Sequence, residues 1–424
     1  MSSEMFSAPL EDCLDALIDY RGKTPEKTIS GIPLITAKII KSGRIETPTE
    51  FIAIDNYNSW MRRGLPKAGD VVLTVEAPLG EVAQLGPEKV ALAQRVVTLR
   101  GKAGVLDNSY LLYLLQTEEM QSQLKARATG TTVLGIKQSE LRKVSLSLPP
   151  IEVQVSSAAI LKALDDRITL LRETNTTLEA IAQALFKSWF VDFDPVHSKQ
   201  QGRIPEGMDE ATAALFPDSF EESELGLVPM GWQIGTLGDL LSLRNERTKP
   251  SAQTASLPYV PIENITAKSP FLQNHKSGEE ANSSLILFRK GDVLFGAMRP
   301  YFHKVCSAPF DGVTRTTVFT LTSRNPKASG FALFQVYQDT TIDYATQHSE
   351  GSTIPYAKWS KSLENMSIVL PSSNLQERFS EVVSVFVECA NENLRQAQTL
   401  VTLRDTLLPR LISGQLRLPE AEAM

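Results

Sequence analysis

Residues 150–190 read PIEVQVSSAAILKALDDRITLLRETNTTLEAIAQALFKSWF, and this stretch decides how the chain is organised. Two of its seven heptad positions are occupied by apolar residues throughout, apart from Asn175. One row holds Leu161, Ile168, Asn175, Ala182 and Trp189, and the other holds Leu164, Leu171, Leu178 and Leu185. An apolar repeat of 3.5 residues predicts a helix that packs along its length against another helix.

Prolines mark both ends of this predicted helix. Pro149 and Pro150 stand where it should begin, and Pro195 stands just past its expected end. A helix of some forty residues would span roughly 60 Å at about 1.5 Å per residue. So long a helix in mid-chain should hold apart the segments on either side.

The composition is that of a globular protein with two or three domains: 424 residues, 42% hydrophobic and 22% charged. No apolar run is long enough to cross a bilayer, and the N-terminus lacks the pattern of a signal peptide. Cys13, Cys306 and Cys389 are far apart and in no paired spacing. We therefore expect a cytoplasmic protein without disulfides or a zinc knuckle.

The net charge of −6 hides a segregation of charge along the chain. Residues 20–150 carry 18 basic and 12 acidic groups, and residues 237–371 carry 14 and 11. Residues 151–236, between them, carry 6 basic and 14 acidic groups. An acidic chain with two basic blocks can still bind a polyanion.

The chain contains an internal repeat with a period of about 222 residues. The matching segments keep their order and spacing: Gly69-Asp70-Val71 with Gly291-Asp292-Val293, LPP (148–150) with LPS (370–372), TGTT (129–132) with EGST (350–353), and RGKTP (21–25) with RNERTKP (244–250). Agreement in order and spacing makes chance a poor explanation.

The long helix has a copy at 374–413. Its first predicted row holds Phe379, Phe386, Asn393, Leu400 and Leu407, and its second holds Val382, Cys389, Gln396 and Leu403. The chain therefore reads as a globular unit followed by a long helix, twice over. Packing of each helix on its own domain is the alternative, but the four-heptad repeat and its duplicate favour an antiparallel helix pair.

Each globular unit reads as mixed α/β. Short β-branched runs bounded by Gly and Pro predict strands at 32–40, 70–77, 82–86 and 94–100, and at 258–265, 292–298 and 317–322. Amphipathic segments predict helices at 108–128, ending at Gly130, and at 330–347. Residues 191–236 are acidic and rich in Gly and Pro, with a short helix at 209–216, and the second unit should begin near Gly231-Trp232.

The patterns of catalytic and cofactor sites are missing. Gly22-Lys23-Thr24 resembles the end of a phosphate-binding loop, but the glycine required earlier is replaced by Leu17. The four histidines have no metal-ligand spacing, and each is more often structural. We expect a binding protein with no catalytic residue, no metal and no cofactor of its own.

Several segments together resemble one protein family. The segments are GTTVLGIK (130–137), SELRKVSLSLPPIEVQ (139–154), LFKSWFVDFDPV (185–196), LVPMGW (227–232) and RDTLLPRLISGQL (404–416). They are similar to segments of the specificity subunits of type I restriction–modification systems, and the resemblance covers nearly the whole chain. The second repeat departs mildly, with Pro371-Ser372 in place of Pro-Pro, which leaves the start of the second helix open within 372–376.

The resemblance implies a fold and a role in defence against phage. The fold is α+β: two mixed α/β target-recognition domains, separated by a pair of long antiparallel coiled-coil helices, in a tandem repeat with pseudo-twofold symmetry. Each domain would read one half of a bipartite site in double-stranded DNA, and the helices would set the spacing. Two modification subunits would methylate adenine N6 with S-adenosylmethionine, and two restriction subunits would use ATP and Mg²⁺. No membrane is involved.

The expected divisions follow from these landmarks. They are 1–149 for the first recognition domain, 150–190 for the central spacer helix, 191–230 for an acidic linker, 231–371 for the second recognition domain, and 372–424 for the second spacer helix and tail.

Candidate DNA-binding residues are polar, mostly basic side chains on the loops of the two domains, because Lys and Arg bind phosphates and polar side chains read base edges. They are Arg21, Lys23, Lys38, Lys41, Arg44, Arg62, Arg63 and Lys137, then Arg244, Arg247, Lys249, Asn264, Lys268, Arg299, Tyr301, His303, Lys304 and Arg315. A lone cation on a loop is more often only solvated. Arg62-Arg63 after Trp60, and RPYFHK (299–304), are the best candidates because basic and aromatic residues cluster there.

Candidate helix-pairing residues are the apolar row members and two asparagines: Leu164, Leu171, Asn175, Leu178, Leu185, Phe386, Asn393, Leu400 and Leu407. A polar residue at a seam position can fix register at some cost in stability, so we expect Asn175 and Asn393 to set the alignment. Two other functions stay open: a coiled-coil scaffold that binds protein, and a fused methyltransferase or nuclease with an unfamiliar site.

Overall fold

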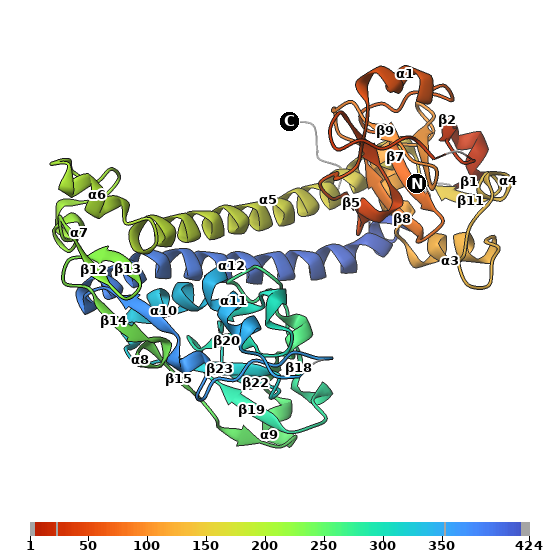
Figure 1. The fold of residues 1–424 in the computed structure, drawn as a ribbon. Helices are drawn as coiled ribbons and strands as arrows, with labels where there is room; N and C mark the ends of the chain where they lie inside the picture. The colour runs from red at the N-terminus through yellow and green to blue at the C-terminus, as the bar shows by residue number, and fades with distance from the viewer. Residues whose placement is uncertain (1–4, 23, 352, 417–424) are drawn as a thin grey trace, which may run out of the picture. The chain divides into compact units, whose positions relative to one another are not determined.

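The computed structural model describes residues 5–22, 24–351 and 353–416. Two compact units divide the chain: one joins the chain up to Ile168 with the chain from Gln398 onward, and the other is Thr169–Ala397. Each unit combines a mixed α/β part with a stretch of both long helices, α5 (Ile151–Phe190) and α12 (Ser373–Ile412) (Figure 1). The mixed α/β class and the long central helix are confirmed.

The main sheet is the same in both units. In the first, the strand order is β2 (Leu14–Asp19), β10 (Val96–Gly101), β7 (Val71–Val75) and β8 (Leu79–Gln84). In the second it is β15 (Leu241–Leu243), β23 (Val318–Ser323), β20 (Val293–Gly296) and β21 (Val305–Ser307). Val71 pairs with Leu99, and Val293 pairs with Leu321, so register as well as order repeats after 222 residues.

A short antiparallel ladder precedes each long helix. β1 (Phe6–Pro9) pairs with β11 (Ser145–Leu148), and β14 (Gln233–Thr236) pairs with β24 (Ser367–Leu370). In the first turn of each helix a glutamine side chain donates to a proline carbonyl, Gln154 to Pro149 at 2.9 Å and Gln376 to Pro371 at 2.8 Å. These bonds fix the turn from ladder to helix, and α12 begins at Ser373.

Further elements complete each unit. The first contains β3 (Ile32–Ile35), β4 (Ile40–Lys41), β5 (Arg44–Ile45), β6 (Phe51–Ile52), β9 (Ala91–Leu92), α1 (Tyr57–Trp60), α2 (Asn108–Leu114), α3 (Glu118–Ala126) and α4 (Gln138–Leu141). The second contains α6 (Asp194–Gln200), α7 (Glu210–Ala214), β12 (Phe220–Ser223), β13 (Gly226–Pro229), α8 (Leu237–Leu240), β16 (Arg247–Thr248), α9 (Ala252–Ala255), β17 (Pro258–Tyr259), β18 (Lys276–Ser277), β19 (Leu285–Phe288), β22 (Gly312–Thr314), α10 (Ser329–Val336) and α11 (Asp339–Gln347).

Several predicted elements are shorter than expected. The helix predicted at 108–128 is two helices, because the Thr117 side chain accepts from the Met120 amide and caps a new one. The helix predicted at 330–347 is likewise divided into two helices, α10 and α11.

Two predicted strands are also shorter than expected. The strand predicted at 32–40 ends at Ile35. The strand predicted at 258–265 ends at Tyr259, before a 3-10 turn that follows Pro261. Proline has no amide hydrogen to donate to a ladder.

Residues 191–230 are packed, with the predicted helix at 209–216 present as α7. Val196 and Phe216 are buried in the same core as Trp189 of α5. Asp209 caps α7 and accepts from Arg378 of α12 at 2.8 Å. This segment therefore contributes to the core of the second unit.

The repeated Gly-Asp-Val motif builds one turn twice. Gly69 and Gly291 have φ of +84° and +89°, which glycine adopts without steric cost. Asp70 accepts from the Lys67 amide and Asp292 from the Arg289 amide, both at 2.8 Å. The two carboxylates are only 1% and 3% exposed, so each needs a buried cationic partner.

The cationic partner comes from different strands in the two units. Arg100 of β10 binds Asp70 at 2.8 Å, whereas Arg244, which follows β15, binds Asp292 at 2.8 Å. Thr322 stands at the position of Arg100 in the second repeat and donates to Asp292 at 2.8 Å. The hydrogen bond to aspartate raises the pKa of each arginine. Both repeats therefore contain the ion pair, but the arginine comes from β10 in the first unit and from the residue that follows β15 in the second.

The first predicted row of α5 is buried throughout. Leu161, Ile168, Asn175, Ala182 and Trp189 are all buried. In the second row Leu171 is buried, while Leu164, Leu178 and Leu185 are half-buried. The first row therefore carries most of the contact along this helix.

The second predicted row of α12 is wrong by one residue. Cys389 and Leu403 are exposed, and the buried row is Val383, Ala390, Ala397 and Leu411. Alanines let two helix backbones approach closely, which leaves the Ala390 carbonyl within reach of a side chain on α5. The first row keeps Phe379 buried, with Phe386, Asn393, Leu400 and Leu407 half-buried.

The two long helices are antiparallel in the second unit. Asn175 donates to the Ala390 carbonyl at 3.0 Å, and Asn393 donates to the Asn175 carboxamide oxygen at 2.9 Å. Further along α5, Phe186 packs on Phe379, which precedes Ala390 in α12. In the first unit, Arg404 of α12 binds Asp165 of α5 at 2.7 Å.

Replacing Asn393 with Leu should lower the melting temperature, because the buried Asn175 oxygen loses its donor at a cost of about 1–3 kcal/mol. Replacing both asparagines with Leu should recover part of that loss, since apolar seam residues suit a helix pair. Thermal unfolding of the two single variants and the double variant measures the coupling. Additive losses would contradict a paired role.

The exchanged ion pair allows a rescue experiment. Arg244→Ile should destabilise the chain by about 3–5 kcal/mol, because it leaves Asp292 buried with its charge uncompensated. Strand register places Ile18 at the position of Arg244, because Leu17 pairs with Leu99 and Leu243 pairs with Leu321. Arg244→Ile with Thr322→Arg therefore recreates the arrangement of Ile18 and Arg100 in the first unit and should recover most of the stability. Chemical denaturation measures both variants, and a double variant no more stable than the single one would refute the equivalence.

Candidate nucleic-acid interface

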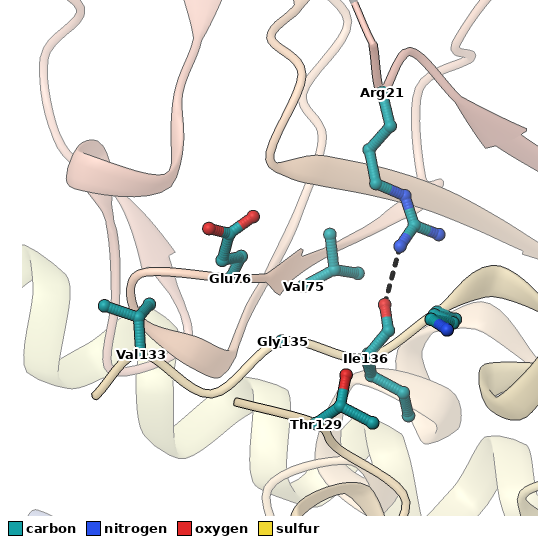
Figure 2. Close-up of a pocket in the computed structure, with 8 residues that line it drawn as sticks. Arg21, Val75, Glu76, Thr129, Val133, Gly135 and Ile136 are labelled. Atoms are coloured by element: carbon teal, nitrogen blue, oxygen red, sulfur yellow. Dashed lines mark hydrogen bonds between the residues drawn. The ribbon is translucent and has the colours of Figure 1, made fainter. Parts of the chain in front are cut away.

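In the first unit, Arg21 follows β2 and is fixed in place. Its guanidinium forms a two-pronged bond to Asp19 and donates to the Ile136 carbonyl at 2.6 Å. Figure 2 shows the bond between Arg21 and Ile136 among the residues that line a hollow. The volume of this hollow is about 250 Å³. The hollow is also lined by Val75, Glu76, Thr129, Val133, Gly135 and Lys137. Arg21 therefore builds the wall of this site as well as carrying charge.

Other predicted cations gather at the same end of the sheet. The Arg63 guanidinium donates to the carbonyls of Asp19 and Arg21, at 3.0 and 2.8 Å. Arg62, Arg63 and Lys137 are all exposed. We call Arg21, Arg62, Arg63 and Lys137 the first basic cluster. Exposed cations grouped in this way suit a phosphate backbone.

Trp60, which precedes this pair of arginines, has a structural role. Its ring stacks on Tyr20 with centroids 5.6 Å apart, and its Nε1 donates to the Leu92 carbonyl at 3.0 Å. Burial raises the pKa of Tyr20, whose hydroxyl accepts from the Arg63 amide. The aromatic residues thus hold the arginine segment against the domain.

The TGTT segment forms a loop that pairs with the β7–β8 turn. Thr129 pairs with Gly135, and Gly135 pairs with Glu76. Gly130 has φ of +113°, and a side chain there would lie 2.1 Å from the Val133 carbonyl oxygen. Glycine is therefore required at the loop's bend, and Val133 and Leu134 are exposed at its tip.

The second unit repeats this loop. Glu350 pairs with Tyr356, which pairs with Met298, and Gly351 has φ of +97°. Ile354 is exposed, as Val133 is in the first unit. The one-residue shift predicted between TGTT and EGST is confirmed by these pairings. The residues of EGST include Ser352, which lies outside the described residues.

Strand register corrects one match within the repeat. Leu17 pairs with Leu99, and Leu243 pairs with Leu321, so Leu17 is equivalent to Leu243. Arg21 is then equivalent to Arg247, and not to Arg244 as the sequence match suggested. Arg247 donates to Asn245 at 3.1 Å, as Arg21 donates to Asp19. The sequence alone could not place the two-residue insertion that distinguishes RNERTKP (244–250) from RGKTP (21–25), because the motif is too short to align in only one way.

The remaining candidates of the first unit lie elsewhere. Lys41 and Arg44 belong to the β4–β5 hairpin, where Lys41 binds Glu46 and Arg44 donates to the Asp165 carbonyl at 3.4 Å. Lys38 is exposed. Lys23 lies outside the described residues.

In the second unit, several candidates meet at the β20–β21 turn. Lys268 donates from its amide to the His303 carbonyl at 2.8 Å, and Lys304 donates from Nζ to the Ile262 carbonyl at 2.8 Å. Burial lowers the pKa of Lys304. Arg299 is half-buried, and Tyr301 is exposed. The structure thus brings Lys268, Arg299, Tyr301 and Lys304 together.

Two candidates of the second unit do not fit an exposed loop. His303 is only 5% exposed and packs on Tyr337, and its burial lowers its pKa although Asp339 opposes this. Arg244 is occupied by Asp292 and Glu246. Neither side chain is free to meet DNA in this conformation. The sequence alone did not show that His303 is buried or that Arg244 has an acidic partner, so both were predicted as loop residues.

The other candidates of the second unit are spread along loops. Arg247, Lys249 and Arg315 are exposed, and Asn264 is half-buried. The individual candidates did not include Lys358, and they included Phe302 only as part of the 299–304 segment. Lys358 is exposed, binds Glu350, and is equivalent to Lys137 through the shifted loop repeat, which could have identified it.

Among residues 5–22, 24–351 and 353–416, no group of three or more His, Cys, Asp or Glu side chains is placed to hold a metal ion. Within the same residues, the helices are too short or too polar to cross a membrane.

Comparison with known proteins gives consistent matches. The family described as Type I restriction modification DNA specificity domain matches residues 20–180 and 229–402. The MjaIX specificity subunit of Methanocaldococcus jannaschii is 28% identical over 84% of this chain and 80% of that protein. The HindI specificity subunit of Haemophilus influenzae is 24% identical over 78% and 82%.

A solved structure shares the fold. It is the S subunit of a type I restriction–modification system from M. genitalium, 16% identical, with a TM-score of 0.62 over 97% of this chain and 96% of that one. The two family matches lie one in each half of the chain and each includes part of a long helix. This chain belongs to the family of type I restriction–modification DNA specificity subunits.

Proposed function

We propose that each of the two α/β domains reads one half of a bipartite site in double-stranded DNA, and that the chain itself performs no catalysis. The observation that carries this proposal is the repeated surface made by a sheet turn and the loops at 129–137 and 350–358, with cations beside it in both units. A repeated reading surface suits a target with two separate halves.

The charge distribution supports a DNA ligand. Arg62, Arg63 and Lys137 are exposed beside the first loop, and Lys268 and Lys358 are exposed in the second unit. Phosphate contacts of this kind provide affinity and register, while polar side chains on neighbouring loops provide sequence discrimination.

The long helices have the complementary role in this proposal. Their buried seam fixes how they align, and this alignment sets the spacing between the two halves of the site. The exposed helix faces recruit two modification subunits, and two restriction subunits join the complex. S-adenosylmethionine, ATP and Mg²⁺ belong to those partners. The divisions at 1–149, 150–190, 191–230, 231–371 and 372–424 remain our functional assignment.

Arg63→Glu should weaken binding to a selected cognate duplex by roughly tenfold and reduce the slope of log affinity against log salt by about 1, because a phosphate contact is lost. A fluorescence-anisotropy titration at several salt concentrations measures both quantities.

Lys102→Glu is the matched control. Lys102 is exposed in the same unit but follows the other end of β10, where its amide donates to the Cys13 carbonyl. The substitution changes the charge by the same amount at a position away from the first basic cluster. The salt slope of this variant should therefore equal that of the wild type. Equal slopes for all three proteins would argue against the cluster as the DNA-binding surface.

A further inference from the structure

We infer that the turn at residues 299–303 is a base-stacking wedge, in which Tyr301 and Phe302 insert against base faces and unstack one base step in the half-site read by the second unit. This inference rests on the proposed DNA-reading function and assigns these two side chains a role other than phosphate or base-edge contact.

The aromatic pair is presented to solvent. Tyr301 and Phe302 lie in the 3-10 turn Pro300–Phe302 and are 48% and 47% exposed. Their ring centroids are 4.9 Å apart. Two adjacent exposed rings leave a large apolar surface in water, which a base face can cover.

The backbone holds this pair firmly at both ends. Arg299 donates from its amide to the Pro355 carbonyl at 2.7 Å, and His303 donates to the Pro300 carbonyl at 2.8 Å. The His303 carbonyl accepts from the Lys268 amide at 2.8 Å, while Pro300 is buried. A turn anchored in this way loses little conformational freedom when it meets a ligand.

The residues that flank the pair are strained. Arg299 and His303 have φ of 53° and 51°, the left-handed region that β-carbons disfavour. Such strain persists where the surrounding structure imposes it, and it clusters at functional sites.

The same two residues carry hydrogen-bonding capacity that the fold leaves unmet. Arg299 Nε and His303 Nε2 are buried without a hydrogen-bond partner among the described residues. His303 Nδ1 lies 3.3 Å from Asp339, so only one side of its ring is engaged. Buried nitrogens without partners are rare, and here two of them bracket the aromatic pair.

Charge favours a nucleic acid as the occupant. Lys268 is exposed and bonded to the turn through its backbone. Of the nearby carboxylates, Glu263 binds Lys276 at 3.5 Å. Asp339 faces His303, but burial lowers the pKa of this histidine, so Asp339 keeps its negative charge at the edge of the turn. Aromatic rings beside cations fit stacked bases flanked by phosphates, and apolar wedges between base steps are an established way to deform a duplex.

The first unit lacks this device. Its equivalent turn also begins with a left-handed residue before proline, Ala77 with φ of 49°. The following residue, Leu79, packs against the core of its own unit, and Gly80 comes next. The wedge is therefore a property of one half of the repeat, and it predicts an asymmetric distortion of the DNA site.

The experiment uses the full chain and a duplex selected by it from a random pool. Permanganate oxidises unstacked thymines, and 2-aminopurine placed along each half-site reports unstacking at other positions. The wild type should give reactive or fluorescent positions in one half-site only. Tyr301→Ala with Phe302→Ala should abolish this signal and weaken binding by about 10- to 100-fold. The salt slope should not change, because no charge is removed.

Two controls make the result specific. Leu79→Ala alters the equivalent turn of the first unit and should leave the unstacking signal intact. Tyr301→Phe keeps both rings and should also keep the signal, and thermal unfolding checks that each variant is folded.

An unstacking signal that survives removal of both rings would overturn the inference, as would specific binding by the wild type with no unstacked base in either half-site. Failure of the wild type to select any duplex would instead refute the proposed function itself. Loss of affinity with a reduced salt slope would show that the turn contacts phosphates and does not stack on bases.

Discussion

The pairing of Asn175 with Asn393 and with the Ala390 carbonyl is the constraint on which the helix arrangement of the second unit depends. A leucine seam alone is tolerant of sliding by a heptad, because each apolar contact can be replaced by a similar one. A buried carboxamide cannot slide in this way, since any other register leaves it without partners. The alanines beside it allow the close approach that these bonds need.

Each domain is also tied to α5 by a buried tyrosine. Tyr113 donates to Asp165 at 2.8 Å in the first unit, and Tyr337 donates to Glu179 at 3.4 Å in the second. Burial raises the pKa of both tyrosines, so their hydroxyls stay protonated and can donate near neutral pH. Burial also raises the pKa of Glu179.

The sequence predicted those parts of the fold that depend on periodicity. The heptads gave α5 to within a residue, and the repeat gave two similar sheets. It could not place the second seam of α12, because Val382 and Leu403 are as apolar as the residues that are buried. Close backbone approach, which favours alanine, is a property of the pair and not of one helix. Likewise, the partner of Asp292 could not be read from the first repeat, since the arginine had moved to another strand.

The candidate site was predictable in composition but not in geometry. Arg63 and Lys137 are exposed as expected, whereas His303 is buried and Arg244 is bound to Asp292. The difference follows from neighbours that are distant in sequence: Tyr337 covers His303, and Asp292 binds Arg244.

Duplication explains why such differences arise. Once a domain exists twice, the core of each copy must keep its ion pair and its glycine bends, but the tip of a turn is free to change. Leu79 in one copy and Tyr301-Phe302 in the other occupy equivalent turns, so the two halves can treat their DNA differently while sharing one scaffold.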